Sequence, residues 1–342
     1  MKKICAFLLL LVACSASVFA QDDAQFTLFP WATMYYNPGA MGEQSNTLCF
    51  TAFYRQAYLG WQDVYQDENG NITKEKTAPR EFLFNIESYL RKAKGSFGLS
   101  ILSDRVGFYN NVGVRLGYAY KLKIPTGHLG IGLQVSFFNQ SINGTKLHAL
   151  ETGDELLDKI KGENESVMDF DINFGLFYKA ERWNVGLSGT QLITKARLSG
   201  DNSIINRSRQ LYAHGGYIWI LPWNPNWTIE PSALLKTDLK SVQFDLMLLT
   251  RYNGVFWGGL SYRIDDAVSV LFGARPFYNH SNNYLKGIDL GLAYGFTTSK
   301  LGWKKNRGFG DLEIMVRYCF DIYKEEIFSG YGSTRNIYKN QY

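Results

Sequence analysis

The feature that most constrains this chain is a unit of about ten residues with alternating apolar and polar side chains, repeated from Leu48 almost to its end. Apolar side chains stand at every second position of 112–120, 170–178 and 288–296. A period of two is the period of a β-strand, so each unit has one apolar and one polar face. Repeated this often behind an export signal, the pattern predicts an all-β fold, an antiparallel transmembrane β-barrel in an outer membrane.

The first twenty residues predict that export signal. Two lysines precede an apolar run of eleven residues, and 18–20 has the layout of a cleavage site after Ala20. A run this short cannot cross a hydrocarbon core of about 30 Å as a helix. The stretch Leu11–Cys14 also resembles a lipobox, which would leave a lipidated Cys14 at the mature terminus. Both processing routes stay open at this point.

The composition favours a membrane barrel over a nucleic-acid-binding protein. The formal net charge of +5 falls to +3 once the two signal lysines are removed, which is too little for a nucleic-acid surface. Aromatic residues make up 15% of the chain, and 33 residues are glycine. Aromatic side chains form girdles at both membrane interfaces, and glycine suits tight turns and crowded barrel walls.

Fourteen strands are predicted, over 47–57, 81–92, 95–105, 111–122, 128–142, 168–179, 182–190, 209–219, 226–236, 241–251, 254–263, 267–277, 285–296 and 310–320. With the N-terminus in the periplasm, the four longest connections all fall on the external side, as outer-membrane barrels require. The predicted segments are a signal peptide over 1–20, a periplasmic, plug-like lead-in over 21–46, the barrel over 47–320 and a short periplasmic tail over 321–342.

The two faces of the predicted strands differ in chemistry. The apolar positions assigned to lipid include Phe82, Phe84, Ile86, Val242, Phe244, Leu246, Leu248, Leu312, Ile314, Val316, Tyr318 and Phe320. The charged positions of opposite parity include Arg55, Glu87, Arg91, Arg115, Asp169, Asp171, Asp245, Asp289, Glu313 and Arg317. A lysine or arginine facing lipid at the midplane costs about 2–4 kcal/mol, so these charges are assigned to the lumen. Fourteen strands enclose more space than side chains easily fill, but loops can plug it, so an open pore does not follow.

Motifs in the lead-in and first strand carry a resemblance to a known family. They are Asp22–Thr27 (DDAQFT), Tyr35–Gly42 (YYNPGAMG) and Tyr54–Gln56 (YRQ), followed by Trp61. They resemble the PorP/SprF family, outer-membrane proteins of the type IX secretion and gliding-motility machinery of Bacteroidetes. Further similar stretches are 98–107, 116–120, 231–236 and 257–263, so the resemblance covers most of the mature chain.

Three positions depart from the family pattern. Gly39 stands where the family moves from proline to alanine, Leu28 replaces an expected glutamine, and Arg55 and Trp61 are spaced more widely than usual. The resemblance implies a non-enzymatic barrel that helps to deliver or anchor secreted cell-surface proteins. Its implied partners are outer-membrane lipid, periplasmic ring proteins of the machinery and secreted surface cargo, with no nucleic acid. The alternative is an outer-membrane channel or a solute-binding, porin-like barrel.

The motif residues are the candidates for docking: Phe26, Tyr36, Asn37, Pro38, Gly42, Tyr54, Arg55 and Trp61. Asn37 and Pro38 precede two glycines and form a turn cluster where the chain enters the barrel. This cluster is either an entry elbow or plug, or a docking surface for a periplasmic partner. We expect Arg55 to pair with a carboxylate in the lumen.

No catalytic, metal or cofactor site is predicted. The chain has four histidines and no Gly-x-Ser-x-Gly motif, so a hydrolase site lacks its parts. Four acids, Glu151, Asp154, Glu155 and Asp158, lie in one predicted external loop, but they do not follow the twelve-residue calcium-loop pattern. We interpret them as a solvated acidic loop.

Two cysteines remain after removal of the signal, Cys49 and Cys319. They lie in the first and last predicted strands, which become neighbours when a barrel closes. Both have lumen-facing parity and lie near the periplasmic end, in a compartment that permits disulfides. One hypothesis is a disulfide across the barrel seam, and the other is a pair of small buried residues.

Overall fold

The computed structural model describes residues 24–43, 47–66, 72–75, 77–143, 164–193, 197–199, 208–278, 285–298 and 310–322. The predicted signal peptide, the acidic positions 151–158 and the tail after 322 lie outside these residues. Among the described residues, no helix is both long enough and apolar enough to cross a membrane.

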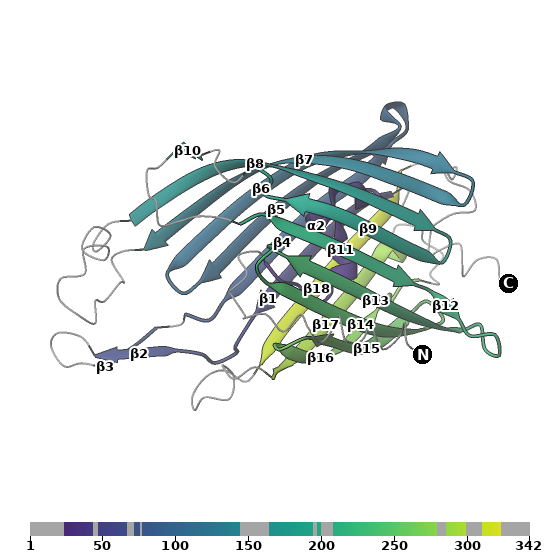
Figure 1. The fold of residues 1–342 in the computed structure, drawn as a ribbon. Coiled ribbons are helices and arrows are strands. Elements are labelled where there is room, and N and C mark those ends of the chain that lie inside the picture. The colour runs from purple at the N-terminus through teal and green to yellow at the C-terminus, as the bar shows by residue number, and fades with distance from the viewer. Residues whose placement is uncertain are drawn as a thin grey trace, which may run out of the picture.

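Fourteen antiparallel strands form a closed barrel, which confirms the predicted fold class (Figure 1). They are β1 (Thr47–Gln56), β4 (Arg80–Leu90), β5 (Gly95–Val106), β6 (Tyr109–Ile124), β7 (Gly127–Asn143), β8 (Asn164–Ala180), β9 (Trp183–Thr190), β11 (Gln210–Tyr217), β13 (Trp227–Thr237), β14 (Val242–Tyr252), β15 (Phe256–Arg263), β16 (Ala267–Ala274), β17 (Ile288–Thr297) and β18 (Asp311–Asp321). Strand β18 pairs with β1 over ten residues, and β8 pairs with β9. The wall is therefore continuous around its circumference.

Smaller elements complete the fold. The short strands β10 (Arg197–Ser199) and β12 (Trp219–Ile220) pair with β8 and β13, and β2 (Asp63–Gln66) and β3 (Ile72–Glu75) form a separate hairpin. The helical turns are η1 (Phe29–Trp31), α2 (Thr33–Tyr36), η2 (Pro38–Ala40), η3 (Arg91–Ala93) and η5 (Leu285–Gly287).

The barrel has two unlike ends. At what we call the loop end lie the connections 57–79, 107–108, 144–163, 191–209, 238–241, 264–266 and 298–310. At the turn end lie the connections 91–94, 125–126, 181–182, 218–226, 253–255 and 275–287. The chain enters β1 and leaves β18 at the turn end, where Thr47 lies opposite Asp321. The two ends thus keep the predicted division into long loops and mostly short turns.

Three of the differences from the predicted strands have a local reason. The strand predicted over 209–219 ends at Tyr217. Its pairing with β13 stops at Gly216 opposite Ser232, because Tyr217 would oppose Pro231, which has no N–H to donate. The strand predicted to reach 277 ends at Ala274, shortly before Pro276. Arg91, assigned to the lumen, begins η3 in the turn after β4 and is exposed.

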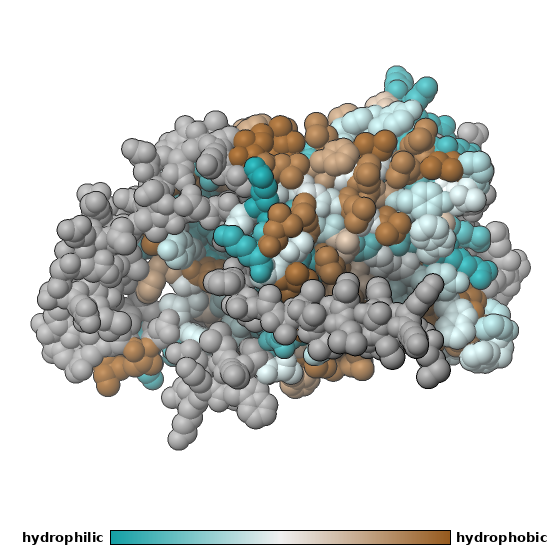
Figure 2. All heavy atoms as spheres, viewed as in Figure 1, coloured by the Kyte–Doolittle hydropathy of each residue, from teal (hydrophilic) through white to brown (hydrophobic). Residues whose placement is uncertain are grey.

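The predicted sorting of side chains holds along the strands. Outward positions such as Phe82, Leu246 and Val316 are exposed and apolar, and Figure 2 shows such side chains gathered on the outward surface. Inward positions carry buried polar and charged groups, among them Arg115, Asp245 and Glu313. This arrangement is the one that a lipid exterior and a polar interior require.

Candidate functional site

The barrel encloses its own N-terminal segment. Residues 24–43, which we call the plug, lie inside the wall, with α2 near the centre of the barrel (Figure 1). Leu28, Tyr35 and Asn37 are completely buried there. The turn η2 contacts β6, β7, β8 and β9. The lumen is therefore occupied by a folded segment of the chain itself.

The plug runs along the lumen from one end to the other. Near the turn end, Gly42 N donates to Glu87 over 2.8 Å, and Glu43 forms an ion pair with Lys179. Near the loop end, Gln25 Nε2 donates to Gln243 over 2.8 Å.

The first half of the plug is held by large side chains, on a face that we call the side-chain wall (β1, β15, β17 and β18). The carboxylate of Glu313 accepts hydrogen bonds from the backbone N–H groups of Thr27 and Leu28, over 2.6 and 2.9 Å. Residues 27 and 28 precede η1, so these two donors have no helical partner. A buried carboxylate that accepts both therefore fixes where the helical turns begin.

Aromatic contacts complete this wall. Trp31 stacks on Trp257 with ring centroids 4.7 Å apart, and Phe26 lies 5.3 Å from Phe53. The indole N–H groups of both tryptophans donate to Asp289, over 3.3 and 3.0 Å. Asp289 was assigned to the lumen from parity alone, and its function here is to orient the stacked pair.

The second half of the plug lies against a face of the lumen on which several inward positions are glycine, which we call the glycine wall. It consists of six inward-facing glycines on β5 to β9: Gly98, Gly117, Gly130, Gly132, Gly175 and Gly186. A methyl group at Gly132 would overlap Pro38, and one at Gly175 would overlap the side chain of Asn37. The plug backbone thus lies directly on the backbone of the wall, at a distance that only glycine permits.

Polar side chains fix this half in register. Asn37 Oδ1 accepts from Gly39 N over 2.9 Å, and its Nδ2 donates to the carbonyl oxygen of Leu176 over 2.9 Å. The hydroxyl of Ser188 donates to the carbonyl oxygen of Tyr36 over 2.9 Å, and Lys121 Nζ donates to that of Gly39 over 2.9 Å. Every bond joins the plug to a strand or closes its own turn, so the plug is bonded as one of the barrel's own elements.

Arg115 holds the plug at Tyr35, between its two halves. It donates to the carbonyl oxygen of Tyr35 over 2.8 Å, and its guanidinium lies over the ring of Tyr35 at 3.9 Å. An arginine stacked on a tyrosine ring combines a charge-assisted hydrogen bond with a cation–π contact. This inward charge therefore holds the plug and does not line an open passage.

The motif residues lie mostly inside the barrel. Those buried against the wall are Phe26, Tyr36, Asn37, Pro38, Gly42 and Arg55. Tyr54 instead faces outward and is 39% exposed, and Trp61 lies after β1 with its ring 5.5 Å from that of Tyr58. In this conformation the buried residues cannot touch a partner, so the geometry favours the plug alternative for Asn37 and Pro38.

Arg55 bridges two lumen carboxylates. It donates to Glu81 over 3.2 Å and to Asp311 over 2.7 Å, and all three side chains are buried. Asp311 also accepts from the backbone N–H of Tyr58 over 3.0 Å. This network ties β4, β1 and β18 together close to the loop end.

Cys49 and Cys319 lie opposite each other in the pairing of β1 with β18, and a disulfide joins them. Their Cα atoms are 4.1 Å apart, and 270 residues separate them in sequence. The disulfide therefore crosses the seam where the barrel closes.

Sequence reasoning missed the glycine wall. Its signal was available, because glycine recurs at inward parity on five consecutive strands, where a lumen-lining residue was expected. Lys121 was also missed, and Met41, although part of the motif 35–42, was not among the candidate residues. Met41 packs against Gly98 and Gly117, where a methyl group would collide with its side chain. Among the described residues, no group of three or more histidines, cysteines, aspartates or glutamates is placed to hold a metal ion.

The family comparison agrees with this architecture. Residues 18–318 match the family described as "Type IX secretion system membrane protein PorP/SprF". No curated protein matches. Among solved structures, the chain is similar to the toluene transporter TodX of P. putida, with 10% identity, 84% of this chain and 93% of that chain covered, and a TM-score of 0.49. It is also similar to the CymD monoaromatic hydrocarbon channel, with 11% identity, 85% of this chain and 92% of that chain covered, and a TM-score of 0.49. The translocator domain of the autotransporter NalP from Neisseria meningitidis is similar too, with 11% identity, 86% of this chain and 96% of that chain covered, and a TM-score of 0.39.

Proposed function

The chain belongs to the PorP/SprF family of type IX secretion system membrane proteins, and on this premise we propose that it is a plugged outer-membrane anchor of that machinery. The protein is an outer-membrane β-barrel. The observation that carries the proposal is the occupied lumen, because a segment bonded to both walls leaves the barrel available as a membrane platform. The partners of the protein then bind at its two ends.

The proposed division of labour follows the two ends of the barrel. The loop end faces the cell exterior and contacts secreted surface proteins, which the barrel helps to deliver or anchor. The turn end faces the periplasm, where ring proteins of the machinery bind. A contribution to gliding motility is part of the same proposal, through surface proteins that move the cell.

A conductance measurement tests the plugged state. The full mature chain is inserted into a planar bilayer beside a variant that lacks residues 24–43. We expect no steady ion current through the full chain and a steady current through the deletion variant. A steady current through the full chain, with the plug still protected from protease, would count against the plugged anchor.

Partner capture tests the anchor function. The 321–342 tail leaves the last strand at the turn end, so its deletion is expected to keep the barrel inserted and to weaken co-purification of periplasmic partners. The control is a deletion within the connection 144–163, which opens at the opposite end and is expected to weaken capture of surface cargo instead. Unchanged capture of both partner classes by both variants would contradict the proposal.

A solute channel is the second candidate. A polar cavity of about 140 Å³ lies beside the plug towards the turn end, lined in part by Lys179, Arg251 and Arg275. It would serve as a vestibule if the plug left the lumen. The same bilayer recordings distinguish the two functions, because a channel must conduct without removal of residues 24–43.

A further inference from the structure

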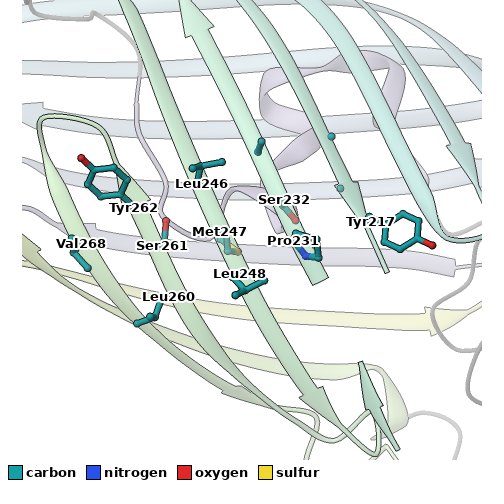
Figure 3. Close-up of a pocket in the computed structure, with 13 residues that line it drawn as sticks. Tyr217, Pro231, Ser232, Leu246, Met247, Leu248, Leu260, Ser261, Tyr262 and Val268 are labelled. Carbon is teal, nitrogen blue, oxygen red and sulfur yellow. The ribbon is translucent and has the colours of Figure 1, made fainter. Parts of the chain in front are cut away.

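An apolar groove of about 650 Å³ crosses the outward face of the wall over β11, β13, β14, β15 and β16 (Figure 3). Its lining includes a directly opposed pair of small residues, Gly215 and Ala233. Tall apolar side chains stand around it, among them Leu246, Leu248 and Leu260. None of the thirteen residues that line the groove carries a charge.

The groove exists because glycine and alanine occupy part of the wall, where larger residues would fill it. Gly216, next to Gly215, faces inward opposite Ser232, so the wall is thin on both faces at this point. Unlike the glycine wall, these two glycines do not touch the plug: the atoms that a methyl group at either position would meet belong to Asn184, Ser232 and Pro231, at 3.1 to 3.6 Å. Plug packing therefore does not explain why small residues occupy these positions.

The groove runs from near one rim of the barrel towards the other. Tyr262 and Val268 flank the turn 264–266 at the loop end, whereas Tyr217 is the last residue of β11, next to the turn end. Figure 3 shows the lining residues as a band across several strands, with Tyr217 and Tyr262 on opposite sides of it. The residues Val268, Tyr262, Leu246, Ala233 and Gly215 are directly opposed from strand to strand, so the groove runs at right angles to the strands. Because barrel strands tilt by about 35–45° from the membrane normal, the groove crosses the hydrocarbon region obliquely.

A cluster of tryptophans marks the turn end of the groove. The described tryptophans that are exposed on the outside of the barrel are Trp183, Trp219, Trp223 and Trp227. All four lie between β9 and the start of β13, and Trp183 is paired directly with Tyr217. Indole rings prefer the headgroup level of a membrane, so this end of the groove opens where lipid headgroups lie.

We propose that the groove is a specific binding site for one acyl chain of a phospholipid from the surrounding outer membrane, with its headgroup beside the tryptophan cluster. The lining supplies dispersion contacts along the chain, and the small pair Gly215 and Ala233 lets the chain lie closer to the barrel than bulk lipid does. The proposal rests on the barrel's place in the membrane and not on the plug, so the two can fail separately.

Native mass spectrometry of the whole mature barrel tests the site. Protein is extracted in a detergent that strips bulk lipid, and we compare wild type with Ala233→Phe, which fills the floor from the lipid side. The matched control is Ala213→Phe, an outward alanine on β11 that does not line the groove. We expect wild type and the control to retain one lipid with the mass of a phospholipid, and Ala233→Phe to lose at least ten-fold of that occupancy.

A labelling experiment on the unmodified protein removes dependence on the folding of a variant. The probe is a phosphatidylethanolamine with a photoreactive group in one acyl chain, reconstituted in vesicles. We expect labelled peptides to concentrate in β13 to β15 by at least five-fold over β5 to β7. Uniform labelling, equal lipid retention by Ala233→Phe, retention of a lipoprotein or lipid A mass, or a dimer that Ala233→Phe dissolves would each overturn the proposal.

Discussion

The two faces that grip the plug do so by opposite means. The side-chain wall reaches inward with Glu313, Asp289 and Trp257 and binds chosen donors and rings of residues 24–32. The glycine wall has glycine at the inward positions that residues 37–41 cover, so these residues lie directly against its strands. The difference shows that a barrel can bind a segment of its own chain either with inward side chains that contact it or with inward glycines that make room for it. The first means depends on the chemistry of the side chains, whereas the second depends mainly on shape, with hydrogen bonds from Ser188 and Lys121 to the plug backbone.

The largest effect is expected at the glycine wall, where the plug fits only because side chains are absent. Gly132→Leu combined with Gly175→Ala puts side chains into the space of Pro38 and Asn37, and each overpacked position costs about 1–3 kcal/mol. We expect the second half of the plug to leave the lumen, measured as protease cleavage within 33–43 and as steady current in a bilayer. Gly189→Ala is the control, because its methyl group would meet flexible leucine side chains at 3.0 and 3.3 Å and a backbone oxygen no nearer than 3.9 Å. Continued protection of 33–43 would refute the steric account.

The next effect concerns the seam between β1 and β18, two strands of the side-chain wall. Replacing both Cys49 and Cys319 by serine removes a covalent link between the first and last strands, which is expected to cost about 2–4 kcal/mol of stability. Unfolding in detergent, followed by the electrophoretic shift of the barrel, measures the loss. Reductant should lower the stability of wild type and leave the double variant unchanged. Two free thiols in natively purified protein would show that the bond is absent.

A smaller effect separates the two halves of the plug. Glu313→Ala leaves the N–H groups of Thr27 and Leu28 buried without their acceptor, at a cost of about 1–3 kcal/mol. Hydrogen exchange is expected to quicken at 27–29 and to stay slow at 37–41. Glu313→Gln keeps a carbonyl oxygen and should lose less protection. Equal acceleration in both halves would mean that the walls act as one unit.

The smallest effect tests the aromatic part of the same wall. Trp257→Phe keeps a ring against Trp31 but removes the N–H bond to Asp289, and we expect a loss of about 0.5–1.5 kcal/mol. The unfolding midpoint in denaturant measures it. Trp219→Phe, on the outer surface, is the control and should leave the midpoint within error. A larger shift for the control would contradict the assignment of stability to the plug contacts.

How far the sequence predicts this molecule follows from the range of the interactions. The strands and their faces were predictable because a period of two is local, and Asp245 and Glu313 face inward as their parity requires. The partners of Glu313 were not predictable, since Thr27 lies 286 residues away and offers only backbone N–H. Gly132 and Gly175 carry no side chain to sort, so alternation shows their face but not what lies on it.

The disulfide and the plug together have a consequence for the order of assembly. The segment that fills the barrel is made before any strand, yet the bond that completes the circumference involves β18, the last strand. Either the leading segment is already in place when the sheet curls shut, or it must thread a finished cylinder. The plug backbone contacts β7 and β8 too closely for the segment to be threaded through a finished barrel. We therefore expect the sheet to close around residues 24–43.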